Sequence, residues 1–356
     1  MSIKKLLSHG IDSINRRWHS LAWERKVHTS ARKTRKNPIK DGLVLFDTSI
    51  KSLNMGDVII RYYCNKVIKE IFPSKESICI PTHVLPSEEE INGILGIKAK
   101  IVCGTNLITP HYEEFSNWKM PNDLYGYQNI ITLGVGWGYY CKEISRKSRV
   151  VYNTILSKTG MHSVRDSYTE HKFYEMGIRN VVNTGCPTLW GLTEEHCASI
   201  PMGKTKKVIT TITDYDRDPC NDRLMLEILL KEYESVLVWI QGTEDYEYLK
   251  ELIDVSLVEV VPRDFEAYTD VLCQEDIDYV GTRLHAGIHA LNCGRRSLII
   301  AIDNRAIEMG KDFGLPMIHR ESIKMELKER IYESRLTKIK LPFENIKNWK
   351  QQFIKN

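Results

Sequence analysis

Short apolar runs alternate with amphipathic segments along most of the chain from residue 43 onward. In the first half, the apolar runs predict strands at 43–47, 77–80, 99–104, 129–138 and 161–166, the fourth of which runs into a glycine-rich turn. Apolar residues at helical spacing predict helices at 57–72 and 167–177. The second helix carries a capping box, with Ser167 as N-cap and Glu170 three residues later, and Gly177 predicts its end.

The alternation restarts after residues 199–207, where Pro201, Gly203 and several lysines are typical of a linker. Strands at 207–213, 235–242, 257–261, 277–281 and 296–302 are predicted to alternate with helices at 222–233, 244–253, 264–274 and 283–294. This pattern predicts an α/β protein with two Rossmann-like, doubly wound domains. We therefore expect a first domain at 43–198, a linker at 199–207 and a second domain at 208–356.

Both ends of the chain carry further helical patterns. Residues 343–354 place apolar side chains on one side (Phe343, Ile346, Trp349, Phe353), so this last helix is expected to pack back across a domain. Residues 1–42 form a basic arm, whose first 40 residues hold eleven Lys or Arg and two acids, a net charge of +9 in a chain of +4. Its apolar residues also recur at helical spacing. A basic amphipathic arm of this kind can lie on an anionic membrane surface, and docking on the body or on a partner subunit explains the same pattern.

Composition narrows the class of protein. No run approaches the ~20 apolar residues that span a bilayer, and the start of the chain lacks a secretory signal, so we expect a cytoplasmic protein, with the arm on the inner face of the membrane. The nine cysteines include no CxxC pair, which argues against a disulfide framework and a zinc ribbon. The mildly acidic body lacks a basic face interleaved with aromatic residues, so a nucleic-acid partner is not expected. Nothing in the pattern specifies an oligomeric state.

The segment DYVGTRLHAGIHALNCG, residues 278–294, places charged and titratable side chains among small and apolar ones. In open α/β sheets, ligands bind beyond the carboxyl ends of strands, where helix N-termini favour anions. A cation at a buried helix start is unfavourable without an anion, so Arg283 and His285 predict an anion site rather than a solvated helix face. His285 and His289 share a helix face, which is compatible with zinc. No third ligand is evident, and His289 is interpreted as a hydrogen-bonded core histidine.

Two other polar clusters follow predicted strands. Arg165 and Asp166 end the strand at 161–166, where Asp166 either caps the next helix or pairs with Arg165. The loop at 54–57 begins with Asn54 and follows the first strand; in it, Gly56 allows close backbone approach and Asp57 is the expected N-cap. The turn LGVGWG at 133–138 matches neither a dinucleotide-binding fingerprint nor a P-loop.

Taken together, these blocks resemble the polysaccharide pyruvyl transferase family. The resemblance rests on NMGDVII, GVGWG, HSVRDSYTEHKFYEMGIRNVVNTGCPTL and VGTRLHAGIHALNCGRRSLIIAIDNRAIEMGKDFGLP, in this order, and covers roughly residues 43–335. The chain has Cys186 where the family often has an acidic residue, so no catalytic role is assigned there. It has Arg305 where the family often has a lysine, which keeps the positive charge.

The resemblance implies a fold like that of GT-B glycosyltransferases, with two domains facing across a cleft. It also implies that the enolpyruvyl group of phosphoenolpyruvate is moved onto two hydroxyls of one sugar, giving a cyclic pyruvate ketal and phosphate. The acceptor would belong to a surface polysaccharide, such as a capsule, an exopolysaccharide or a cell-wall polymer, or to its lipid-linked precursor. Phosphoenolpyruvate is then the donor substrate, and no cofactor and no metal are expected.

The expected site is drawn from the matching blocks. Arg165 and Arg283 suit the phosphate and carboxylate of the donor by bidentate hydrogen bonds. His285 suits protonation of the vinyl carbon, and Asp57 suits stabilisation of a positively charged transition state. The expected substrate-binding residues are Arg165, Arg283, Leu284, Asn54, Gly56 and Arg305.

Two other function classes stay open at this point. A GT-B glycosyltransferase would bind a nucleotide sugar in the same cleft. A non-catalytic, surface-anchored scaffold would keep the fold and bind no anion, and the joint presence of Arg165, Arg283 and His285 argues against it. Binding of phosphoenolpyruvate or of a nucleotide sugar distinguishes the three.

Overall fold

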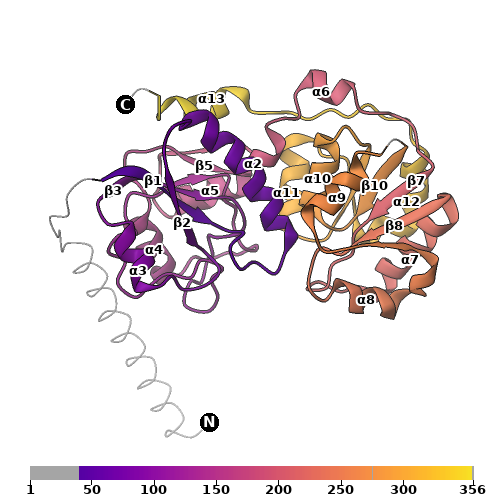
Figure 1. Cartoon of the computed structure of the whole chain (residues 1–356), viewed down its shortest axis with the longest axis horizontal. Helices are drawn as coiled ribbons and strands as arrows, with labels where there is room; N and C mark the ends of the chain where they lie inside the picture. The colour runs from indigo at the N-terminus through magenta and orange to yellow at the C-terminus, as the bar shows by residue number, and fades with distance from the viewer. Residues whose placement is uncertain (1–39, 275, 355–356) are drawn as a thin grey trace, which may run out of the picture.

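The computed structural model describes residues 40–274 and 276–354. Figure 1 shows two lobes side by side, each built around strands with helices packed against them. The predicted basic arm lies almost entirely outside the described residues, so its helical pattern and its membrane contact stay predictions. No helix in the described part of the chain is long and apolar enough to cross a membrane.

The first lobe contains a parallel sheet of strand order β2-β1-β3-β4. Its strands are β1 (Lys40–Asp47), β2 (Ser77–Pro81), β3 (Ile97–Cys103) and β4 (Ile131–Leu133). A bridge between Val135 and Val164 continues it to the parallel pair β5 (His162–Val164) and β6 (Val181–Asn183). The connecting helices are α2 (Met55–Ile71), α3 (Glu88–Gly93), α4 (Arg146–Ile155) and α5 (Ser167–Glu175). The strand order changes direction between β1 and β3, which creates a switch point at the carboxyl end of the sheet.

The second lobe contains a six-stranded parallel sheet of order β12-β11-β10-β7-β8-β9. Its strands are β7 (Lys207–Thr210), β8 (Ser235–Trp239), β9 (Glu259–Val261), β10 (Ile277–Gly281), β11 (Ser297–Ala301) and β12 (Met317–His319). Its helices are α7 (Pro219–Glu232), α8 (Asp245–Leu252), α9 (Phe265–Leu272), α10 (Leu284–Asn292), α11 (Asn304–Phe313) and α12 (Ile323–Tyr332). This order has its switch point between β7 and β10.

Helix α2 joins the two lobes through apolar packing. Figure 1 shows it at their junction, and its Ile59, Ile60 and Tyr63 belong to one buried cluster with Leu284 and Ile288 of α10. Burial of such a cluster stabilises the relative placement of the lobes, because separation would expose the whole apolar surface to water. The cleft between the two sheets is therefore built on a packed base.

The chain crosses between the lobes twice. After α6 (Glu194–Ala198) it enters the second lobe at β7, and α13 (Phe343–Gln351) returns to the first. Trp349 is fully buried, with its ring centroid 6.0 Å from that of Trp190. The Lys350 ammonium lies 2.6 Å from the Glu70 carboxylate. The last helix thus packs across a domain, on the first lobe, whereas the predicted boundaries included it in the 208–356 unit.

Two predicted helix starts are corrected by the structure. Asn54 is the N-cap of α2, with its Oδ1 accepting from the Gly56 amide at 2.9 Å, so Asp57 lies in the first turn. Asp166 is the N-cap of α5, with its Oδ1 accepting from the Thr169 amide at 2.7 Å, and Ser167 is already helical. In both cases an Asn or Asp residue that precedes the predicted cap is the true N-cap. Its backbone is extended, and its side-chain oxygen accepts from an amide of the first helical turn.

Candidate active site

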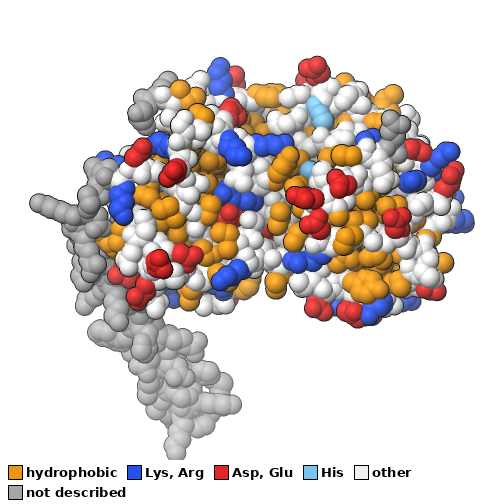
Figure 2. All heavy atoms as spheres, viewed as in Figure 1, with side chains coloured by type: hydrophobic (Ala, Val, Ile, Leu, Met, Phe, Trp, Pro, Cys, Tyr) orange, Lys and Arg blue, Asp and Glu red, His pale blue; other side chains and the backbone are white. Residues whose placement is uncertain are grey.

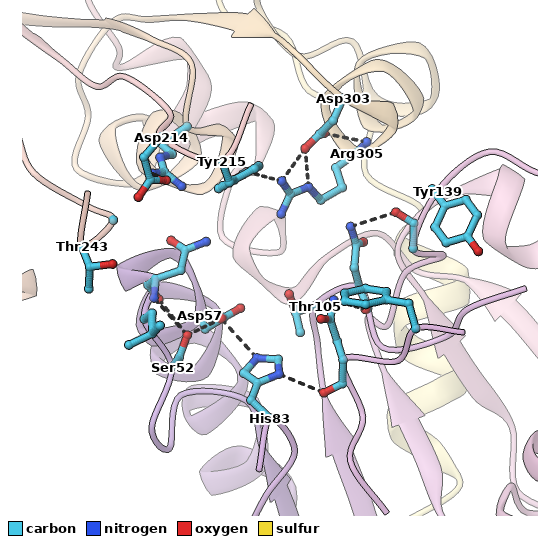
Figure 3. A pocket seen from close by; sticks show the side chains of 18 of the residues that line it. Ser52, Asp57, His83, Thr105, Tyr139, Asp214, Tyr215, Thr243, Asp303 and Arg305 are labelled. Carbon is cyan, nitrogen blue, oxygen red and sulfur yellow. Dashed lines mark hydrogen bonds and ion pairs between the residues drawn. The ribbon is translucent and has the colours of Figure 1, made fainter. Parts of the chain in front are cut away.

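A cavity of about 990 Å³ opens where the switch points of the two sheets face each other. Loops after β1, β2 and β3 form one wall, and loops after β7, β8, β10 and β11 form the other. Figure 3 shows Ser52, Asp57, His83 and Thr105 on the first wall, opposite Tyr215 and Arg305 on the second. Asn54, Asp57, Arg283 and Arg305 from the predicted set line this cavity.

A small recess shares part of the cavity wall. Asp57, Thr105 and Arg305 line both spaces, and the recess is also lined by Gly56, Leu284 and His285. Three helices, α2, α10 and α11, begin at this wall, so their positive dipole ends converge on it, and α10 is the one of the three without a side-chain cap. The structure therefore brings seven of the eight predicted site residues to one place, whereas the eighth, Arg165, is buried and lines neither space.

Asn54 and Gly56 hold the two lobes together. The Gln241 side chain donates to Asn54 Oδ1 at 2.7 Å, and the Met55 amide donates to the Gln241 carbonyl at 3.2 Å. A Cβ on Gly56 would lie 3.1 Å from the Gln241 side chain. The absence of a side chain at Gly56 therefore lets Gln241 of the opposite lobe pack closely against this loop.

Asp57 is a carboxylate at the cavity wall. Its Oδ2 accepts from the Ser52 hydroxyl at 2.6 Å and lies 3.3 Å from His83 Nε2. Burial alone would raise the pKa of Asp57, but the hydrogen bonds and charge of His83, together with Ser52 and Thr105, hold that pKa below its ordinary value. Asp57 is therefore ionised at neutral pH.

Thr105 follows β3 in a strained conformation. Its φ is 53°, in the left-handed region that a β-branched residue rarely adopts, and it follows Gly104 at φ 60°. A Cβ on Gly104 would lie 2.2 Å from the Ile60 side chain, so glycine is required there. Strain of this kind persists where surrounding contacts enforce it, and it is common at functional sites.

Arg283 is paired with carboxylates of its own lobe. It is the N-cap of α10, and its Nη2 lies 2.5 Å from Asp245 and 3.1 Å from Asp214. Its Nε donates to the Ile212 carbonyl at 3.0 Å. The buried cation thus has protein anions, which the sequence argument for a ligand anion overlooked. Only Nη1 lacks a partner among the described residues.

Arg165 keeps more of its hydrogen-bonding capacity free. Its side chain is 1% exposed, and its Nε donates to Asp166 Oδ2 at 3.1 Å. Asp166 thus both caps α5 and pairs with Arg165, as one of the two sequence interpretations held. Neither Nη1 nor Nη2 has a partner among the described residues. A Cβ on Gly136 would lie 2.1 Å from Arg165 Cζ, so the turn at 133–138 exists in part to admit this guanidinium.

Arg305 and His285 complete the charged cluster. Arg305 donates to the Asp303 carboxylate and to the Tyr215 hydroxyl. His285 is 6% exposed, and its Nε2 lies 3.8 Å from the Cys186 thiol. Burial, and then the charges of Arg305 and Arg165, lower the pKa of His285 to about 3. In the free protein His285 is therefore a neutral imidazole at neutral pH, which does not hold the proton that the sequence interpretation gave it.

His289 is a core residue, as the sequence indicated. Its Nδ1 lies 2.8 Å from the Tyr63 hydroxyl, and its Nε2 lies 3.1 Å from the Thr269 hydroxyl. Burial lowers the pKa of His289 to about 4. Both ring nitrogens are satisfied within the protein. Across residues 40–274 and 276–354, no group of three His, Cys, Asp or Glu side chains has the arrangement of a metal site.

Sequence reasoning missed His83, Thr105, Asp214, Tyr215 and Asp303 as cavity residues. His83 and Thr105 come directly after β2 and β3, and Asp214 and Asp303 come after β7 and β11. The rule that ligands bind beyond the carboxyl ends of strands would have selected these positions, had it been applied to every predicted strand.

Comparison with known protein families gives a match over most of the chain. A family model described as polysaccharide pyruvyl transferase matches residues 54–304. A search of curated proteins finds no match.

Solved structures resemble the chain in fold. A UDP-GlcNAc 2-epimerase of Methanocaldococcus jannaschii is 11% identical, with a TM-score of 0.50 over 87% of this chain and 97% of that chain. A UDP-GlcNAc 2-epimerase from Neisseria meningitidis is 12% identical, with a TM-score of 0.46 over 89% and 99%. The wall teichoic acid polymerase TagF is 12% identical, with a TM-score of 0.43 over 99% and 90%. The first likeness and the two facing parallel sheets confirm the predicted α/β, GT-B-like fold.

Proposed function

The chain belongs to the polysaccharide pyruvyl transferase family, and on that premise we propose that it is a ketal-forming transferase using phosphoenolpyruvate. The enolpyruvyl group moves onto two hydroxyls of one sugar of a polysaccharide or its lipid-linked precursor. The donor loses its phosphate, and one hydroxyl proton ends on the new methyl group while the other leaves with the phosphate. The site must therefore bind a phosphate and a carboxylate and must move protons.

The observation that carries this proposal is the buried, partly unpaired guanidinium of Arg165, which lies behind the recess wall, near His285 and Arg305. Two of its nitrogens are buried without a partner among the described residues. A buried donor of a charged group left without an acceptor is costly, and an anionic ligand that accepts from both nitrogens removes that cost. Arg283 Nη1 offers one further free donor on the opposite lobe.

Arg283 and Arg305, which line the site, and Arg165 behind it offer hydrogen bonds more than net charge. Arg165 is matched by Asp166, Arg305 by Asp303, and Arg283 by Asp214 and Asp245. Such matching keeps each cation buried and oriented before the donor binds. The start of α10, which has no side-chain cap, adds backbone amide donors at the same wall. Neutral His285 suits this cluster as a hydrogen-bond donor to the bound anion.

The outer part of the cavity suits a sugar acceptor. Phe115, Tyr139 and Tyr140 line it, and their side chains are 55%, 38% and 48% exposed. Exposed aromatic rings provide apolar faces against which the C–H faces of a sugar ring pack. The cavity of about 990 Å³ leaves room for an acceptor beside the small donor.

Isothermal titration calorimetry with the whole chain tests the proposal. Phosphoenolpyruvate is expected to bind with micromolar to millimolar affinity, and UDP or GDP sugars are expected not to bind. Turnover is then measured as phosphate release with a panel of galactosides, mannosides, glucosides and N-acetylhexosaminides. Binding of a nucleotide sugar without binding of phosphoenolpyruvate would instead support a GT-B glycosyltransferase.

A metal cofactor is not part of this proposal. The leaving phosphate is met by guanidinium and amide donors, which can stabilise its charge without a cation of their own. Phosphate release is therefore expected to be unchanged after dialysis against EDTA. Loss of turnover that zinc or magnesium restores would contradict this.

A further inference from the structure

His83 lies on the cavity wall between two acceptors. It follows β2, and its Nδ1 lies 3.0 Å from the Asn117 carbonyl oxygen while its Nε2 lies 3.3 Å from Asp57 Oδ2. The side chain is 20% exposed, so it reaches the cavity space. Figure 3 shows the ring held between these two partners, beneath Asp57.

The two partners define the protonation state of the ring. A carbonyl oxygen only accepts hydrogen bonds, so Nδ1 carries a proton. An ionised carboxylate also only accepts, so Nε2 carries a proton as well. A ring with protons on both nitrogens is an imidazolium. The geometry therefore describes His83 as a cation paired with the Asp57 anion.

The electrostatic environment agrees with that geometry. Burial and the nearby Lys119 each lower the pKa of His83, but the hydrogen bond and charge of Asp57 and the Asn117 carbonyl outweigh them, so this pKa lies above its ordinary value. His285, in contrast, has no carboxylate in hydrogen-bond contact and lies near two arginines. Of these two histidines at the site, His83 is the one whose surroundings favour the protonated ring.

We propose that His83 is the general acid of the transfer, giving its Nε2 proton to the methylene carbon of the donor's enolpyruvyl group. This inference rests on the proposed function. The electron pair of the C=C bond forms the new C–H bond, and the acceptor hydroxyl oxygen bonds to the central carbon. Asp57 takes the hydroxyl proton and passes it to His83, which restores the imidazolium–carboxylate pair. The second hydroxyl then displaces phosphate, which leaves with the second proton.

The decisive variant is His83→Gln, since glutamine keeps hydrogen bonding but cannot supply the proton. General acid catalysis is worth ~10²- to 10⁴-fold, so kcat is expected to fall by about that factor while the phosphoenolpyruvate Kd changes less than about threefold. His171→Gln is the matched control, because that side chain is 70% exposed on α5. The wild-type rate should decline on the alkaline side, above the ordinary histidine pKa of 6.5, and this decline should be absent in His83→Gln.

Two further variants separate His83 from other roles. In Asp57→Asn the alkaline decline should move to lower pH, because the carboxylate that raises the pKa of His83 is gone. His285→Gln should weaken donor binding and keep the alkaline decline. Imidazole added to His83→Ala should restore part of the rate if the variant lacks only a proton donor. It should restore none of the rate if the variant is inactive because the site is mispacked.

The outcomes also separate this inference from the proposed function. If the wild type binds no phosphoenolpyruvate, the proposed function fails. If the wild type turns over and His83→Gln keeps near wild-type kcat, or keeps the alkaline decline, only the role of His83 is overturned. Loss of the alkaline decline in His285→Gln, with the decline kept in His83→Gln, would assign the acid to His285.

Discussion

Arg165 and Arg283 differ in what their guanidinium groups leave free. Arg165 has two unpartnered nitrogens, whereas Arg283 has one and spends the others on Asp214, Asp245 and a backbone carbonyl. Substitution of these two arginines is therefore expected to affect ligand binding and stability to different degrees. One substitution tests ligand binding, and the other tests mainly the fold.

Arg165→Ala is expected to weaken donor binding strongly and to cost less stability than Arg283→Ala, because it leaves one carboxylate without its cation rather than two. Removal of one partner of a desolvated pair costs ~2–5 kcal/mol, which raises the phosphoenolpyruvate Kd by about 30-fold or more. Asp166 keeps its bond to the Thr169 amide, so α5 keeps its cap. Calorimetry and thermal melting measure the two effects. A large drop in Tm with unchanged affinity in the remaining folded protein would show a purely structural role.

Arg283→Ala is expected to destabilise the second lobe as well as weaken binding. Asp245 is fully buried, and without the arginine its charge loses its main partner. Breaking a buried pair costs ~3–5 kcal/mol. Urea unfolding measures this, with Arg217→Ala, which removes an exposed pair with Glu251, as control. Equal midpoints for both variants would contradict it.

At the scale of elements, long amphipathic segments and apolar runs were predictable, and short ones were not. The five predicted strands of the second lobe and helices α7 to α10 are present, and the predicted run at each strand spans five or more residues, although β9 itself has three. Strands β6 and β12 have three residues each and apolar runs of only two, which gave no such signal. Helix α4 was missed because its apolar residues lie among arginine, lysine and asparagine. The pairing of Asp214 and Asp245 with Arg283 was missed because only the tertiary fold brings these carboxylates to the guanidinium.

Helix α13 gives a prediction at this scale. Trp349→Ala should destabilise the protein by ~3–5 kcal/mol, because the indole is fully buried between Trp190 and Phe353. Phe343→Ala on the same helix, at a position 52% exposed, should change stability by less than about 0.5 kcal/mol. Urea unfolding provides both values. A small effect of Trp349→Ala would mean that α13 detaches easily from the first lobe.

At the scale of the whole molecule, Figure 2 shows Lys and Arg interspersed with Asp and Glu over the visible face, so no single-sign field dominates there. Buried titratable groups therefore govern how stability depends on pH. His162 and His289 have pKa values lowered to about 4, and His285 to about 3, in each case chiefly by burial. Below pH 6.5 these three histidines therefore bind protons in the unfolded chain while they stay largely neutral in the folded protein, down to about pH 4.

The sign of this pH dependence follows from linkage. Between pH 6.5 and about 4 the unfolded chain holds more protons on these three histidines, so the free energy of unfolding falls as pH falls. Each histidine contributes up to about 1.4 kcal/mol per pH unit. His83 acts oppositely, since its pKa is raised and its stabilisation is lost as pH rises.

Urea unfolding at several pH values measures that slope. His289→Gln should reduce the slope between pH 6.5 and 4, whereas His171→Gln, which replaces an exposed histidine, should not. An unchanged slope in His289→Gln would show that its burial does not oppose protonation.

The return of α13 to the first lobe makes the second lobe an insertion within the first. A ribosome must therefore synthesise nearly the whole chain before Trp349 can cover Trp190, while the second lobe has all its strands earlier. The lobe that begins first in synthesis is thus the one completed last. Mechanical force applied between residues 40 and 354 would likewise act first on the first lobe, because both residues belong to it. The force would act on the second lobe only after α13 has detached.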